Sequence, residues 1–308
     1  MKKTVMKALE IKNLTKIYGN DVHALKGIDL SVERGDFFAL LGPNGAGKST
    51  TIGIISSLVT KNDGSISICG VDIDDNFPLA KSKLGVVNQE FNFSQFEKVQ
   101  DVIMGQAGYY GVDPKTAKEK TEHYLKKLGI WDKRDVFIRE LSGGQKRRVM
   151  IIKALIHEPE LLILDEPTAG VDIELRRGLW DFLIEINKSG TTIILTTHYL
   201  EEAENLCRNI AIIDNGQIIE NTKMDLLLQQ LENQIFTIET EQDLPKNLKI
   251  DGFKTNIDGE RKFSVIVPKD TAMNKLFNNE AFKQLKVTNI KNQTNRLEEL
   301  FINLTSKK

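Results

Sequence analysis

The stretch GPNGAGKSTT, Gly42–Thr51, decides the fold of this 308-residue chain. It follows the short apolar run DFFALL, which indicates a buried strand, and it precedes a run that is expected to be a helix. A glycine-rich turn in this context is where the pattern G-x-x-x-x-G-K-[ST] binds phosphate groups. The stretch is not a dinucleotide fingerprint, because Thr50 stands where that pattern has its third glycine.

The residue types of this turn suit a phosphorylated ligand and a metal ion. The glycines allow backbone N–H groups to curl around phosphate oxygens. Lys48 can reach the β- and γ-phosphates, the Ser49 hydroxyl can bind Mg²⁺, and Thr50 lies near the α-phosphate. The alternative is a glycine-rich turn with a chance lysine, which the flanking strand and helix disfavour.

Polar side chains follow three further apolar runs. Asp165 and Glu166 end LLILDE, His198 follows TTIILTT, and Gln89 ends LGVVNQ. Ligands of parallel sheets bind at the carboxyl ends of the strands, so these side chains are expected at one edge. There Asp165 can hold Mg²⁺, Glu166 can orient or deprotonate a water, His198 can contact the γ-phosphate, and Gln89 can reach the metal ion or the water.

Some of these residues also have a structural interpretation. Asp165 and Glu166 alone could be solvated acids at a strand end. Tyr18 follows the first strand and could stack on an adenine, yet each of Tyr18, Gln89 and His198 taken singly is more often structural than functional. The other three histidines keep the structural interpretation because no pattern places them at the ligand edge: His23, His123 and His157.

A second turn, LSGGQKRRV (Leu141–Val149), leads into a basic run that is expected to be helical. Backbone N–H groups at such a helix start suit an anion. The chain therefore contains two turns suited to phosphate, far apart in sequence.

Composition limits the function classes. Lys and Arg number 42 and Asp and Glu number 43, so the net charge of −1 gives no support for nucleic-acid binding by bulk positive charge. Cys69 and Cys207 form no Cys-x-x-Cys pair and are expected to be small buried side chains in a reducing compartment. Lys7, Glu10 and Lys12 interrupt the N-terminal apolar residues, which argues against a signal peptide. No apolar run approaches the ~20 residues needed to span a bilayer.

Strands that alternate with helices indicate an α/β domain with a mostly parallel sheet. An antiparallel entry region precedes it, in ALEIKNLTKIY and ALKGIDLSVE, and IAIIDNGQIIE is expected to be a hairpin at Asn215-Gly216. The pattern changes after about Asp225. LLLQQLENQ is expected to be a helix that leads away. A small α+β region follows over Gln234–Lys308, with strands expected at IFTIET, FKTNI and KFSVIVP and helices at AMNKLFNNEAFKQL and LEELFINLT.

In this order the motifs resemble those of the ATP-binding subunit of an ABC transporter, over roughly Met6 to Met224. Tyr18 matches the A-loop, GPNGAGKST Walker A, Gln89 the Q-loop, LSGGQ the signature, LLILDE Walker B, AGVD the D-loop and His198 the H-loop. The D-loop departs from the family pattern at Gly170 and Val171, where Ala and Leu are common. The resemblance implies a P-loop NTPase cassette at 1–224, with a mostly parallel core sheet, an antiparallel β subdomain and a helical subdomain at about 90–158. A linker helix and a small α+β domain are expected at 225–308.

The resemblance also implies the site. Two such domains pair head to tail, and each ATP lies between the P-loop of one chain and the signature of the other, so the second turn serves a different ATP molecule. Glu166, His198 and Gln89 are the implied catalytic residues, and Ser49, Gln89 and Asp165 the implied Mg²⁺ ligands. The implied nucleotide contacts are Tyr18, Gly42, Pro43, Asn44, Gly45, Ala46, Gly47, Lys48, Ser49, Thr50, Ser142, Gly143, Gly144, Gln145 and Asp172.

The closest resemblance is to stand-alone ATPases that pair with a separate ABC-2 type permease, usually for export. It implies a homodimer, cytoplasmic and peripheral on the inner face of the membrane through the permease, with no nucleic-acid partner. Phe91, Phe93 and Phe96 lie where this family docks its permease, although these rings could instead fill the local core. An importer subunit and a soluble ATPase that acts on ribosomes or DNA are the alternatives. The transported substrate would be recognised by the permease.

The C-terminal region is expected to be dispensable for the ATP site, because every phosphate motif precedes it. Its last segment, LEELFINLT, offers an amphipathic surface for contacts with the dimer, and a passive cap over the main domain is the alternative.

Overall fold

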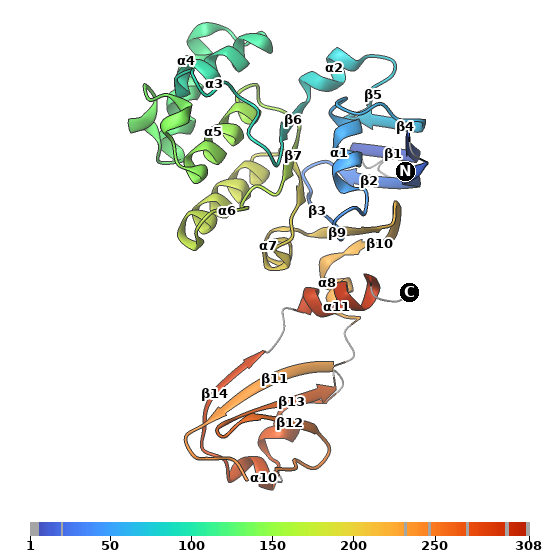
Figure 1. The fold of residues 1–308 in the computed structure, drawn as a ribbon, viewed down its shortest axis with the longest axis vertical. Coiled ribbons are helices and arrows are strands. Elements are labelled where there is room, and N and C mark those ends of the chain that lie inside the picture. Colours follow the sequence, from blue (N-terminus) through green and yellow to red (C-terminus); the bar gives the residue numbers. More distant parts are fainter. Residues whose placement is uncertain are drawn as a thin grey trace. The chain divides into compact units, whose positions relative to one another are not determined.

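A computed structural model describes residues 6–19, 21–230, 233–245, 248–268, 271–292 and 296–305 (Figure 1). The chain divides into two compact units, Met1–Lys223 and Met224–Lys308. The expected boundary after residue 224 differs from this division by one residue. Within the described residues, no helix is both long enough and apolar enough to cross a bilayer.

A six-stranded sheet forms the centre of the first unit, in the order β10-β9-β3-β8-β7-β6. Five of its strands run parallel to one another, namely β9, β3, β8, β7 and β6, and β10 is antiparallel to β9. The three central strands are buried along their whole length, as expected for parallel strands covered on both faces. The strands are β3 (Phe37–Leu41), β6 (Leu84–Val87), β7 (Leu161–Asp165), β8 (Thr192–Thr196), β9 (Asn209–Asp214) and β10 (Gln217–Lys223).

A second, antiparallel sheet with the order β2-β1-β4-β5 lies beside α1. Buried apolar side chains of β1 and β2 pack with α1 and with one face of the central sheet in one buried cluster. The phosphate-binding turn is thereby held between two sheets. The elements are β1 (Lys7–Tyr18), β2 (Val22–Glu33), α1 (Lys48–Ile55), β4 (Asp63–Ile68), β5 (Val71–Asp72) and α2 (Phe77–Ser82).

Helices α3, α4 and α5 contact one another in a helical subdomain inserted between β6 and β7. Asp113 caps the start of α4, and Gly129, with a φ of 64°, follows its C-cap residue Leu128. Two further helices, α6 and α7, precede and follow β8. The bounds are α3 (Val99–Tyr109), α4 (Pro114–Lys127), α5 (Gly143–Leu155), α6 (Ile173–Lys188) and α7 (Leu200–Leu206).

His157 follows the end of α5 and connects it to β6 by a hydrogen bond. Its ring stacks on Tyr110 with centroids 3.7 Å apart, and its Nε2 lies 3.1 Å from the carbonyl oxygen of Leu84. Nε2 is the donor in this bond, which leaves the buried Nδ1 without a partner. Burial lowers the pKa of His157, because a proton on Nδ1 would be a buried charge.

Because the folded state lowers the pKa of His157, this residue should destabilise the protein as pH falls below its unfolded pKa of about 6.5. We expect the melting temperature to fall between pH 7 and pH 5, and His157→Gln to reduce this fall. His123→Gln, at an exposed histidine, is the matched control. Melting curves of the three proteins check this. An equal fall in the wild type and in His157→Gln would contradict the assignment.

The second unit has its own core and a four-stranded antiparallel sheet, β12-β13-β11-β14. The expected helix LLLQQLENQ is wrong beyond its first three residues: α8 ends at Leu228, residues 231–232 lie outside the described ranges, and a strand begins at Asn233. The expected single helix over AMNKLFNNEAFKQL is two short ones. The strand β14 was not expected. The elements are α8 (Met224–Leu228), β11 (Asn233–Thr240), β12 (Lys254–Gly259), β13 (Lys262–Pro268), α9 (Met273–Phe277), α10 (Glu280–Lys283), β14 (Val287–Asn292) and α11 (Arg296–Thr305).

Candidate nucleotide-binding site

The P-loop leaves the start of α1 open for an anion. Gly47 is the N-cap residue with a φ of 116°, and no side chain caps the helix. A Cβ at Gly47 would lie 2.8 Å from Leu25 Cδ2 and 2.9 Å from the Ala24 carbonyl oxygen, so only glycine fits this backbone. The first-turn N–H groups therefore need an acceptor from outside the helix, and a phosphate group supplies one.

Lys48 lies folded over this loop. Its Nζ donates to the carbonyl oxygens of Gly42 at 2.7 Å and Pro43 at 3.0 Å. Burial lowers the pKa of Lys48, while the charges of Glu166 and Asp165 act in the opposite direction. A partly buried cation that is hydrogen-bonded only to carbonyls fits a site for a polyanion.

Glu166 is where three of the expected catalytic residues meet. Its Oε2 accepts a hydrogen bond from Gln89 Nε2 at 3.1 Å and lies 3.3 Å from His198 Nδ1. Glu166 also has a φ of 50°, in the left-handed region that non-glycine residues rarely adopt. Its N–H donates to the carbonyl oxygen of Thr196 at 3.0 Å, which fixes this strained backbone at the end of β7.

Asp165 is buried at the end of β7 and accepts a hydrogen bond from the Thr196 hydroxyl of β8. Burial raises the pKa of Asp165, and this exceeds the lowering by the Thr196 hydrogen bond and by the charges of Lys48 and Arg147. A divalent cation nearby would favour the ionised carboxylate. The exposed hydroxyl of Ser49 is a further oxygen donor of a type that suits Mg²⁺.

Tyr18 lies beside the same turn. Its hydroxyl is 3.4 Å from the Thr50 hydroxyl, and Lys16 Nζ lies 5.1 Å from the centre of its ring. The residue is 39% exposed, so part of the aromatic ring remains accessible for stacking. One site within a single chain is therefore surrounded by the P-loop and by Tyr18, Gln89, Asp165, Glu166 and His198.

The signature and D-loop residues lie elsewhere. Ser142 caps α5: Gln145 N donates to Ser142 Oγ at 3.3 Å, and Ser142 N donates to Gln145 Oε1 at 3.0 Å. Asp172 caps α6 by accepting from Leu175 N at 2.9 Å. Figure 1 shows α5 and α1 apart, with β6 and β7 between them.

The unusual D-loop has a local explanation. Gly170 has a φ of 71°, so a glycine suits this position better than the Ala that is common there. The loop is fastened at its start by Glu202, whose fully buried carboxylate accepts from Thr168 Oγ1 at 3.2 Å and from Trp180 Nε1 at 2.9 Å. Burial raises the pKa of Glu202. Sequence reasoning missed this support, since the three residues are far apart in the chain.

Sequence reasoning also missed Arg147 of α5. Its guanidinium donates to the carbonyl oxygens of Asn88 at 2.8 Å and Gln89 at 2.9 Å. The sequence carries a signal for it, because Arg147 shares an apolar stripe of α5 with Met150, Ile151 and Ala154.

Residues 25–169 match the family model described as ABC transporter. The chain is similar to the Linearmycin resistance ATP-binding protein LnrL of Bacillus subtilis, with 42% identity over 71% of this chain and 70% of the relative. It is similar along 97% of both chains, at 30% identity, to the Nod factor export ATP-binding protein I of Burkholderia orbicola. A Methionine import ATP-binding protein, MetN 4 of Oceanobacillus iheyensis, is 35% identical over 80% of this chain and 75% of the relative.

Solved structures agree with the fold. An ATP-binding subunit of an ABC transporter superposes with a TM-score of 0.68 at 30% identity, covering 72% of this chain and 92% of that one. A dimeric ATP-binding cassette in a post-hydrolysis state, bound to ADP and Pi, has a TM-score of 0.65 at 26% identity and covers 70% of this chain and 98% of that one. The sequence similarity, the cassette fold and the site geometry agree, and this chain belongs to the ATP-binding subunits of ABC transporters, which are ATPases.

Proposed function

We propose that this chain energises export through a separate ABC-2 type permease, and that two copies close head to tail around two Mg-ATP molecules. The dimer proposal rests on one observation. The P-loop and Glu166 form one half of a site, whereas the Ser142 turn begins a different helix, α5. Ser142 and Gly143 are exposed at the start of α5, and Figure 1 shows this helix apart from α1. Two copies related by a two-fold axis would complete both sites, and a structural relative is dimeric.

The roles follow from the placement of each side chain. Lys48 would exchange its two carbonyl acceptors for phosphate oxygens, and the uncapped N–H groups of α1 would bind the same anion. Bound Mg-ATP would supply the phosphoryl group that is transferred to water, with Ser49, Asp165 and Gln89 holding the ion. Glu166 would accept the proton of the water, with His198 beside its Oε2. Tyr18 would stack on the adenine.

The signature would contact the partner chain's nucleotide. Ser142 Oγ and the backbone at Gly143 and Gly144 lie at the start of α5, where the helix dipole favours an anion. Gln145 holds this turn through the capping box, and Asp172 would reach the interface from the start of α6. Hydrolysis would remove the bridging phosphate and reopen the dimer.

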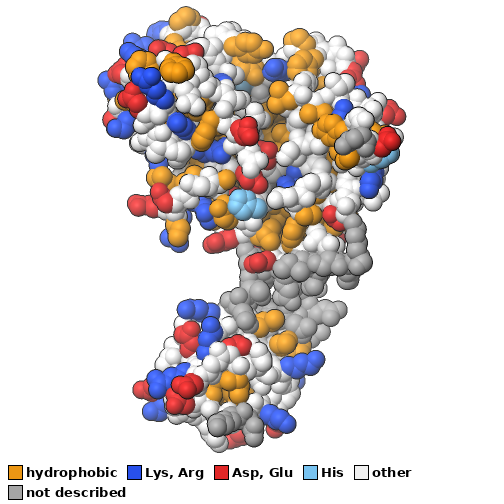
Figure 2. Space-filling model, viewed as in Figure 1, with side chains coloured by type: hydrophobic (Ala, Val, Ile, Leu, Met, Phe, Trp, Pro, Cys, Tyr) orange, Lys and Arg blue, Asp and Glu red, His pale blue; other side chains and the backbone are white. Residues whose placement is uncertain are grey.

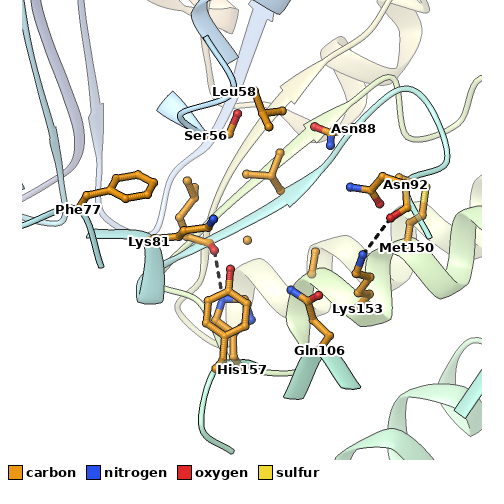
Figure 3. A pocket seen from close by; sticks show the side chains of 15 residues that line it. Ser56, Leu58, Phe77, Lys81, Asn88, Asn92, Gln106, Met150, Lys153 and His157 are labelled. Carbon is orange, nitrogen blue, oxygen red and sulfur yellow. Dashed lines mark hydrogen bonds between the residues drawn. The ribbon is translucent and has the colours of Figure 1, made fainter. Parts of the chain in front are cut away.

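The surface next to Gln89 supports a membrane partner. Phe96 is 74% exposed and Phe91 44% exposed, and therefore they do not fill the local core. Figure 2 shows hydrophobic side chains on the upper rim of this unit, between α3 and α2. A cavity of about 160 Å³ lies here, and Figure 3 shows Lys81, Gln106 and Lys153 around it. Two residues of the same segment, Asn88 and Asn92, line this cavity, and exposed rings on a segment next to cationic and amide groups suit a protein segment of the permease.

Relatives named for export and resistance support export, and full-length similarity to an export protein supports it further. The relative named for methionine import keeps an importer subunit as the second candidate. In either case this chain would lie on the cytoplasmic face of the membrane, held there by the permease.

Co-purification tests the class. The tagged chain, purified from its own host in mild detergent, should bring down one membrane protein that mass spectrometry identifies as a six-helix permease. Phe96→Asp should reduce this recovery by about tenfold or more, because it removes an apolar anchor from the contact. Ile219→Asp, at an exposed residue of the edge strand β10, is the control and should recover the permease normally. Recovery of ribosomal proteins or of an importer permease instead would overturn the export proposal.

A further inference from the structure

The segment Asn88–Asn92 is held by side chains of the signature helix α5. Arg147 Nη1 donates to the Asn88 carbonyl oxygen at 2.8 Å and Nη2 donates to the Gln89 carbonyl oxygen at 2.9 Å. The guanidinium carbon also lies 5.3 Å from the centre of the Phe91 ring. Six residues further along the helix, Lys153 Nζ donates to the Asn92 carbonyl oxygen at 3.3 Å (Figure 3).

The guanidinium is suited to fix this segment rather than only to fill space. Arg147 is 5% exposed, and burial lowers its pKa against the opposing charges of Asp165 and Glu166. Its planar fork binds two successive carbonyl groups, which sets the orientation of the peptide between Asn88 and Gln89. A lysine at this position offers a single ammonium group without the fixed fork.

Gln89 connects this clamp with the catalytic carboxylate. Its backbone accepts from Arg147, while its side chain donates to Glu166 Oε2 at 3.1 Å. Ser142 caps the helix that carries Arg147. A continuous path therefore runs from the signature turn along α5, through Arg147 and Gln89, to Glu166 of the same chain.

We propose that Arg147 is a positioning residue that ties Gln89 to the signature helix, so that nucleotide bound at Ser142 adjusts Gln89 beside Glu166 in the chain's own site. Each site is then coupled to the other within one chain. This inference rests on the head-to-tail dimer proposed above. A purely structural Arg147 would support the helical subdomain without distinguishing the two sites.

The clamp itself can be tested on the full-length chain without nucleotide. In Arg147→Met, amide hydrogen exchange of the peptide covering residues 86–98 should rise by about tenfold, because the carbonyl anchors are lost. Arg148→Met is a matched control: Arg148 Nη1 donates to the Leu128 carbonyl oxygen at 2.8 Å, away from the Gln89 segment. Arg147→Lys, which keeps the charge, should give an intermediate rise and serves if Arg147→Met does not fold. Exchange in Arg147→Met equal to that in Arg148→Met and the wild type would overturn the clamp, as would equal exchange in Arg147→Lys where Arg147→Met does not fold.

Mixed dimers test the coupling. When one chain carries Glu166→Gln and the other is intact, only the intact chain's P-loop site hydrolyses ATP, and it faces the Glu166→Gln chain's signature. Differently tagged chains allow this species to be isolated. Arg147→Met in the intact chain should slow its hydrolysis by about 10- to 100-fold, through misplacement of Gln89. The same change in the Glu166→Gln chain should have a smaller effect: the factor by which it slows this hydrolysis should be at least about tenfold lower.

The outcomes separate the two proposals. Equal slowing by both placements would show that Arg147 has only a structural role, and greater slowing from the Glu166→Gln chain would show that it serves the signature and not Gln89. If Glu166→Gln chains form no dimer with Mg-ATP, the dimer proposal fails and the coupling fails with it. A dimer without the expected asymmetry overturns the coupling alone.

Discussion

Glu166→Gln is expected to lower the turnover number by about 100- to 10,000-fold and to leave ATP binding intact. The carboxylate stands beside Gln89 and His198 at the end of β7, where it can accept a proton from the attacking water. An amide of the same size keeps an oxygen for the Gln89 hydrogen bond but is a far weaker base. Bound ATP should therefore persist.

Steady-state hydrolysis and equilibrium binding of labelled ATP check this expectation. Glu119→Gln, an equally conservative change at an exposed residue of α4, is the control and should hydrolyse ATP normally. A Glu166→Gln protein that turns over ATP at the wild-type rate would show that another group is the base. Loss of ATP binding would show instead that Glu166 mainly holds the nucleotide.

Lys48→Ala is expected to reduce hydrolysis by about 100- to 1,000-fold and to weaken ATP binding, because the cation that the P-loop presents to the phosphates is removed. It also removes the hydrogen bonds from Lys48 Nζ to the carbonyls of Gly42 and Pro43, so the loop loses part of its order in the absence of nucleotide. Lys61→Ala is a matched control. Lys61 Nζ also donates to a backbone carbonyl, that of Gly64 at 2.6 Å, outside the P-loop.

Both variants should melt within a few degrees of the wild type, so that ATP binding by calorimetry is compared on folded proteins. Retention of wild-type hydrolysis by Lys48→Ala would refute the assignment of the phosphate site.

Sequence predicts the side chains that follow the parallel strands well, because parallel strands end at one edge of a sheet. Strands β6, β7 and β8 are neighbours and end at one edge, so Gln89, Asp165 and His198 were expected together from their positions after apolar runs. The phosphate turn was predictable because a strand and a helix flank it. These inferences need only local pattern and one topological rule.

The contacts that support the site were not predictable in this way. The apolar stripe of α5 indicates that Arg147 is buried, but it does not indicate its carbonyl partners, which lie 58 and 59 residues earlier in the chain. Glu202 is an acid in an acidic run, yet it is fully buried between Thr168 and Trp180. Such pairings depend on tertiary packing, which a single sequence pattern does not encode.

The second unit shows where local propensity is overridden. LLLQQLENQ favours a helix, but Asn233 and Gln234 pair with β13 in the antiparallel sheet, so the helix ends at Leu228. β14 was missed because VTNIKN has few apolar residues, and its pairing with β11 supplies the order. Asn279 caps a second short helix and thereby divides the expected long one.

The mass of the Glu166→Gln protein in solution with Mg-ATP tests the central claim most directly. Size-exclusion chromatography with light scattering should show a dimer, because ATP that is not hydrolysed keeps bridging the P-loop of one chain and the Ser142 turn of the other. The wild type, which removes the bridging phosphate, should be mostly monomeric. The double variant Glu166→Gln, Ser142→Arg should bind ATP and stay monomeric, since arginine occupies the place of the partner's γ-phosphate. A monomeric Glu166→Gln protein at saturating ATP, or an intact dimer in the double variant, would contradict the account.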